Sequence, residues 1–201
     1  AEAGPLGPFQ MSDADRYELQ IASWLHDCGK ITTPEWVMDK ATKLQTIFDR
    51  IELVDTRFEC LRREAELASL RQQLAGVPAE QAEAERQALF DALAEEQQFL
   101  RRANIGGEFM AEDKQARVKQ IAKRRFIGPD GIEQPLLTPE EIRNLCIAKG
   151  TLLPEERQVI NNHIVATIKM LESLPYPKHL KRVPEFAGGH HERMDGKGYP
   201  R

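Results

Sequence analysis

The residues of this chain that could do chemistry are histidines and one aspartate. His26 is followed directly by Asp27, and His190 and His191 are neighbours beside two glycines, while His163 stands among apolar residues. Neutral imidazole and carboxylate are standard ligands of first-row divalent metals. A bridging carboxylate such as Asp27 can also hold two ions about 3.5–4 Å apart, as in two-metal phosphoryl chemistry. The pattern therefore predicts a metal site.

Each of these signals has an ordinary structural alternative. A His-Asp pair often arises by chance, and a histidine on an apolar helix face, such as His163, is commonly a hydrogen-bonded core residue. Adjacent histidines in a glycine-flanked stretch are rarer. The combination in one short chain favours metal binding. His179 fits no such pattern and is interpreted as a surface residue.

Two longer motifs contain these residues. His26 to Lys30 reads HDCGK, and His190 to Pro200 reads HHERMDGKGYP. They resemble the HD-x-G-K motif of the HD superfamily of metal-dependent phosphohydrolases and the HHE-x-x-DG-x-GYP motif of its HD-GYP subfamily. The resemblance covers roughly residues 11–47 and 136–201. It implies an all-α bacterial domain whose characteristic reaction is hydrolysis of cyclic di-GMP.

The resemblance implies a role for each matching residue. It makes metal ligands of His26, Asp27, His163, His190 and His191. Asp27 would bridge two divalent ions, iron or manganese with zinc or nickel as alternatives, and Lys30 would neutralise a substrate phosphate beside it. The substrate pocket or a partner-binding surface would be shaped by Arg193, Gly196, Gly198 and Tyr199. Both glycines would also supply backbone positions with unusual φ.

Two ligands of the family pattern have no counterpart in the sequence. The family has a further histidine upstream of the HD pair and an aspartate downstream of GYP. The chain begins without methionine and stops directly after GYP. We therefore expect a piece of a longer protein, with an HD-GYP core that is incomplete at both ends.

Helical signals surround the candidate ligands. Ser12, with Asp15 three residues later, predicts the start of a helix whose apolar stripe leads into the HD pair. Thr138-Pro139 predicts a second helix start. Leu153-Pro154 opens another helix, which carries His163 and ends before Pro175.

The segment between the motifs predicts an inserted helical hairpin over residues 48–135. Its first helix (48–75) follows a heptad seam, with spacings of 4, 3, 4, 3, 4 and 3, made by Ile47, Ile51, Val54, Phe58, Leu61, Ala65 and Ala68. Gly76-Val77-Pro78 separates it from a second helix over 79–103. A short β-hairpin, 125–127 against 132–134, is predicted around Gly128-Pro129-Asp130-Gly131. We expect the seam to pack within the chain, with a homodimer through the hairpin as the alternative.

Composition limits the partners. The net charge of −4 gives no general attraction to nucleic acid polymers. No apolar run reaches transmembrane length. The three cysteines, Cys28, Cys60 and Cys146, are odd in number and form no CxxC pair, which argues against a disulfide framework and favours a reducing cytoplasm. The resemblance also implies a longer parent protein, which a sensor region could tether to the inner membrane.

The sequence thus predicts an all-α HD-type bundle (1–47 and 136–201) interrupted by the hairpin insertion (48–135). The expected function is metal-dependent hydrolysis of cyclic di-GMP to pGpG or GMP in bacterial second-messenger signalling. GGDEF-type or other signalling proteins would bind through the GYP loop. Two alternatives stay open: an inactive module that binds a cyclic dinucleotide or a protein, and an HD phosphohydrolase for another nucleotide.

Overall fold

The computed structural model describes residues 10–200, so residues 1–9 and 201 of the predicted core lie outside the described part. Helices form nearly all of the regular structure, and the described residues contain one small two-stranded sheet. The predicted all-α fold is confirmed. The chain divides into two compact units, Ala1–Met38 with Pro154–Arg201 (unit 1) and Asp39–Leu153 (unit 2).

Unit 1 is built from short helices drawn from both ends of the chain. They are α1 (Asp13–Leu25), the 3-10 helix η1 (Cys28–Thr32), α2 (Glu35–Met38), α7 (Pro154–Asn161), α8 (His163–Glu172), the 3-10 helix η2 (Lys178–Leu180) and α9 (Val183–Gly188). The helix predicted from Pro154 ends before Pro175, as expected. It is broken at Asn162, however, so that His163 becomes the first residue of α8.

Helix α1 begins as its sequence predicts. The Ser12 hydroxyl accepts a hydrogen bond from the Asp15 amide, and the Asp15 carboxylate accepts one from the Ser12 amide, which closes a capping box. Arg182, just before α9, forms ion pairs with Asp15 and with the buried Glu18. The hydrogen bonds from Ser12 and Arg182 lower the pKa of Asp15 to about 2. These contacts join α1 to α9.

A close backbone approach joins η1 to α8. The Gly29 amide donates to the Thr167 hydroxyl at 2.9 Å, and a Cβ on Gly29 would lie only 2.1 Å from the carbonyl oxygen of His163. Only glycine fits between these backbones. The apolar core of the unit lies beside this contact and contains Ala22, Leu171, Val183 and Ala187.

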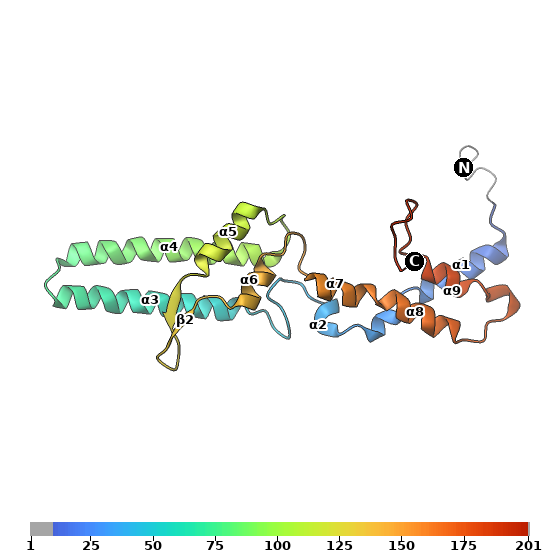
Figure 1. Ribbon diagram of the computed structural model, residues 1–201, viewed down its shortest axis with the longest axis horizontal. Coiled ribbons are helices and arrows are strands. Elements are labelled where there is room, and N and C mark those ends of the chain that lie inside the picture. The colour runs from blue at the N-terminus through green and yellow to red at the C-terminus, as the bar shows by residue number, and fades with distance from the viewer. Residues whose placement is uncertain (1–9, 201) are drawn as a thin grey trace. The chain divides into compact units, whose positions relative to one another are not determined.

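Unit 2 contains the predicted hairpin. Its elements are α3 (Ile51–Leu74), α4 (Ala79–Ile105), α5 (Glu112–Ile121), β1 (Arg125–Ile127), β2 (Glu133–Pro135) and α6 (Pro139–Leu145). Helices α3 and α4 lie side by side and run in opposite directions (Figure 1). Strands β1 and β2 pair antiparallel, with Ile127 opposite Glu133, one residue later than predicted for the second strand.

The heptad seam is only partly as predicted. Val54, Phe58 and Ala65 are buried, but Ile47 precedes the helix and is 92% exposed. Ala68 is exposed and Ser69 is buried in its place, with its hydroxyl bonded to a carbonyl of α4. A straight helix of 3.6 residues per turn drifts away from a strict 3.5-residue repeat, which explains the shift. The buried residues of the seam pack within the chain, and the homodimer through the hairpin stays a prediction.

The core of unit 2 reaches beyond the predicted insertion on both sides. Leu44, Leu136, Leu137 and Leu145 lie outside residues 48–135, and all four pack in the same core as Phe58. Apolar packing therefore draws the flanking segments into this unit. Among the described residues, no helix is both long and apolar enough to cross a bilayer.

Candidate metal centre

Four potential ligands meet in unit 1. Asp27, His163, His190 and His191 each offer one ligand atom, and these atoms all lie within 4.8 Å of one another. Asp27 lies between α1 and η1, His163 begins α8, and the two adjacent histidines follow α9. Three separate parts of the chain therefore contribute to one cluster.

The Asp27 carboxylate lies at the centre of the cluster. Its Oδ1 is 3.3 Å from Nε2 of His163 and 3.8 Å from Nε2 of His190. Nε2 of His191 is 3.2 Å from that of His163. Oδ1 is buried and has no hydrogen-bond partner among the described residues. A buried carboxylate oxygen without a partner is costly, and a cation among these nitrogens would satisfy it, so the residues fit a divalent metal.

Backbone carbonyls hold two of the imidazole rings in an orientation suited to ligation. Nδ1 of His163 lies 2.5 Å from the carbonyl oxygen of Ile160, and Nδ1 of His190 lies 2.6 Å from that of Ala187. Because a carbonyl only accepts, each Nδ1 carries the proton and donates it. Each Nε2 then keeps a lone pair for a metal, the usual arrangement of ligating histidines.

His26 faces the other oxygen of Asp27. Its Nε2 lies 3.1 Å from Oδ2, and its Nδ1 bonds to the carbonyl of Ser23 at 2.6 Å. Lys30 approaches the same oxygen, with Nζ 2.7 Å from Oδ2. His26 is thus outside the four-residue cluster, although its ring packs edge-on against that of His190 at 4.7 Å. A bridging role for Asp27 and ligation by His26 stay predictions.

The electrostatics of Asp27 and His191 favour their metal-binding forms. Burial alone would raise the pKa of Asp27, but the hydrogen bond from Lys30 and the charges of His26 and Lys30 outweigh it and lower this pKa. Burial, followed by the neighbouring His190 and His163, lowers the pKa of His191. A carboxylate that is ionised and an imidazole that is neutral are both free to bind a metal.

The GYP segment (Gly198-Tyr199-Pro200) contacts His191. The ring of Tyr199 stacks on the His191 imidazole, with centroids 4.5 Å apart and planes 16° apart. Gly196 has the predicted positive φ, at 68°. The prediction of an unusual φ is wrong for Gly198, which is needed for space, since a Cβ there would lie 2.5 Å from Cα of Glu192.

The remaining predicted residues are exposed. Arg193 pairs with Asp195 at 3.2 Å, and Lys30 keeps 42% of its side chain exposed beside Asp27. Their contacts with substrate stay predictions. His179 is exposed on η2, as expected. Thr167 was missed, because a threonine four residues after a histidine carries no recognisable signal, yet its hydroxyl holds η1 in place.

Comparison with known proteins gives one match. Residues 136–201 match the family model of the HD domain. The matched segment contains His163, His190 and His191 and does not include the HD pair at His26 and Asp27. Searches of curated proteins and of solved structures found no match. The matched segment, with the histidine–aspartate cluster that it helps to build, supports a metal-dependent phosphohydrolase of the HD superfamily.

Proposed function

We propose that this protein is a metal-dependent phosphodiesterase that opens cyclic di-GMP to pGpG and then to GMP. Metal chemistry is proposed because four potential ligands meet around Oδ1 of Asp27, a buried oxygen without a hydrogen-bond partner among the described residues. These ligands are Asp27 itself, His163, His190 and His191. The choice of substrate has separate support, namely the resemblance of HHERMDGKGYP to the HD-GYP motif. We propose manganese or iron, because imidazole and carboxylate together suit both.

Each residue of the centre has a defined task in this proposal. A divalent metal bound there would supply Lewis acidity toward the phosphoryl oxygens and a water of lowered pKa. The three imidazoles would hold it through Nε2, while the carbonyls of Ile160 and Ala187 keep two of the rings in place. Asp27 has one oxygen beside His163 and His190 and the other beside His26, so this carboxylate would be the residue that holds two ions in the proposed site.

Lys30 provides the positive charge that an anionic substrate needs in a protein with a net charge of −4. Its ammonium group uses one N–H on Asp27 and remains partly exposed, so two donors are free for a phosphate oxygen. Tyr199 shields one face of His191, which orients this ligand and narrows access to it from that side.

Metal binding is tested first, by measuring the metal content of the chain after loading with Mn²⁺ and removal of the excess. Asp27→Ala and His190→Ala should lose most of the bound metal, because both remove a central ligand. His179→Ala is the matched control, since it removes an exposed histidine of the same unit. Equal metal content in all variants would refute the centre.

Substrate choice is tested with the Mn²⁺-loaded chain and cyclic di-GMP, with the products separated by chromatography. We expect pGpG and GMP from the wild type and from His179→Ala, and intact substrate with Asp27→Ala. Lys30→Gln should still bind metal, because all four residues of the cluster remain, but should turn over more slowly. Cleavage of another nucleotide in place of cyclic di-GMP would identify a different HD phosphohydrolase, and binding without cleavage would identify an inactive module. Either result would overturn the proposed reaction.

A further inference from the structure

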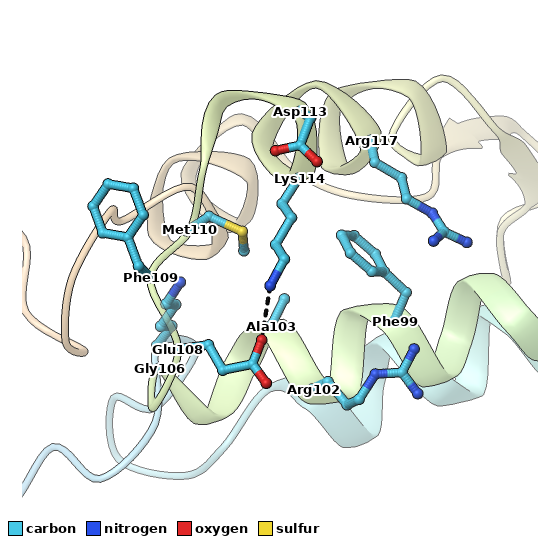
Figure 2. Close-up of a pocket in the computed structure, with 11 residues that line it drawn as sticks. Phe99, Arg102, Ala103, Gly106, Glu108, Phe109, Met110, Asp113, Lys114 and Arg117 are labelled. Atoms are coloured by element: carbon cyan, nitrogen blue, oxygen red, sulfur yellow. Dashed lines mark hydrogen bonds and ion pairs between the residues drawn. The ribbon is translucent and has the colours of Figure 1, made fainter.

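Unit 2 contains a cavity that shares no residue with the metal centre. It lies between the C-terminal end of α4, the loop that follows and the first turns of α5 (Figure 2). Its volume is about 330 Å³. This volume is within the range of roughly 300–1,000 Å³ that is usual for small-molecule sites. The proposed hydrolysis makes no use of it.

Aromatic and other apolar side chains form part of the cavity wall. Phe99 and Met110 are almost completely buried, and Ala103 lies beside them. Phe109 also lines the cavity but is 67% exposed. In the view of Figure 2, the rings of Phe99 and Phe109 lie on opposite sides of the space. A flat apolar group against Phe109 would cover aromatic surface that is now in water.

The charged side chains of the wall leave an excess of positive charge. Four of the lining residues are basic and two are acidic. Glu108 is paired with Lys114 at 2.7 Å, and Arg117 is paired with Glu95 and lies over the Phe99 ring. Arg102 forms no hydrogen bond or ion pair with any residue between 10 and 200, although its charge helps Lys114 to lower the pKa of Glu108.

Lys43 adds a second cation without an acidic partner. Its side chain is buried, and its Nζ donates to the carbonyl oxygens of Leu145 at 3.1 Å and Ile147 at 2.9 Å. An ammonium group has three donors, and the third finds no partner in the described part of the chain. A buried cation paired only with neutral carbonyls is stabilised by an added anion.

We propose that this cavity binds a small organic anion with a flat, apolar body. The ring system would lie against the exposed ring of Phe109, and its carboxylate, sulfonate or phosphate group would be recognised by Arg102, with Lys43 adding positive charge to the same wall. An apolar wall with a few polar groups is the usual composition of sites of this size. The two cations would make an acid bind more tightly than its uncharged amide.

The test is a titration of the full chain with 2-naphthoate, followed by the amide resonances in ¹H–¹⁵N correlation spectra. We expect saturable shifts that are concentrated between Phe99 and Arg117. Naphthalene-2-carboxamide has the same ring system without the charge, and it should bind about tenfold more weakly or worse.

Two variants and one matched control assign the binding to the cavity. Arg102→Gln and Phe109→Ala should each weaken 2-naphthoate binding by about tenfold. Both side chains are exposed, so the fold should persist. Arg101→Gln removes the neighbouring arginine of α4, which pairs with Asp55 and does not line the cavity, and should bind as the wild type does.

Three results would each overturn the proposal. One is the absence of saturable binding up to the solubility limit of the probe. The second is equal affinity for the acid and the amide. The third is an affinity in Arg102→Gln that equals that of Arg101→Gln. None of these measurements depends on metal or on hydrolysis, so this inference and the proposed function can fail independently.

Discussion

Replacing Gly29 with alanine is the sharpest test of how the fold assembles the metal centre. The added Cβ would lie 2.1 Å from the His163 carbonyl oxygen, where ordinary contact begins at 3.4 Å, so η1 and α8 must separate by about 1.3 Å. Overpacking of this kind costs about 1–3 kcal/mol. Losing the buried hydrogen bond from the Gly29 amide to Thr167 adds about 1 kcal/mol. We therefore expect unit 1 to lose about 2–4 kcal/mol of stability.

The same displacement should weaken metal binding, because Asp27 lies two residues before Gly29 and His163 supplies the clashing carbonyl. Urea unfolding followed by tryptophan fluorescence reports on unit 1, since both tryptophans of the chain, Trp24 and Trp36, belong to it. Metal content after Mn²⁺ loading is the second measurement.

Gly189→Ala is the matched control, because a Cβ there would meet its nearest neighbour at an ordinary 3.4 Å. It should change the free energy of unfolding by less than about 0.5 kcal/mol. If Gly29→Ala unfolds at the same urea concentration as Gly189→Ala and binds metal equally well, the close approach of η1 to α8 does not exist as described.

Three further substitutions test other parts of the structure. Phe58→Ala should destabilise unit 2 by about 3–5 kcal/mol, because the ring is fully buried. Urea unfolding followed by circular dichroism measures this loss. As a control, Leu74→Ala removes an exposed side chain and should stay within about 0.5 kcal/mol of the wild type. Arg57→Met removes the bidentate partner of buried Glu141 and should cost about 3–5 kcal/mol in the same assay; a loss below 1 kcal/mol would contradict the buried pair. Tyr199→Leu should weaken Mn²⁺ binding severalfold in equilibrium dialysis by removing the ring stacked on a ligand imidazole, while Tyr199→Phe, which keeps the ring, should bind like the wild type.

The local features of the fold were readable from the sequence because they depend on residues within one or two turns of each other. Ser12 with Asp15, and Thr138 with Glu141, form capping boxes at the starts of α1 and α6. Gly76 ends the first helix of the hairpin with a positive φ. Short-range hydrogen bonds and allowed backbone angles are properties of neighbouring residues, so such boundaries were predicted to within a few residues.

Features that depend on packing were predicted less well. The break at Asn162, the burial of Ser69 in place of Ala68 and the extension of unit 2 to Leu44 and Leu145 have no local signal. The cavity beside Phe99 also joins residues of α4 and α5 with Lys43, which lies in an earlier part of the chain. These features follow from how side chains fill space between elements, which no local pattern encodes.

For the metal centre, the sequence by itself determined which residue types could ligate a metal and named His26, Asp27, His163, His190 and His191 as candidates. The tertiary structure alone decided that Asp27 directs one oxygen toward His163 and His190 and the other toward His26. The reason is that the distances between the ligands depend on a contact between two segments that are far apart in the sequence. In this contact, Gly29 lets η1 approach the backbone of α8. Residue types can be read from a motif, but their distances are set by packing.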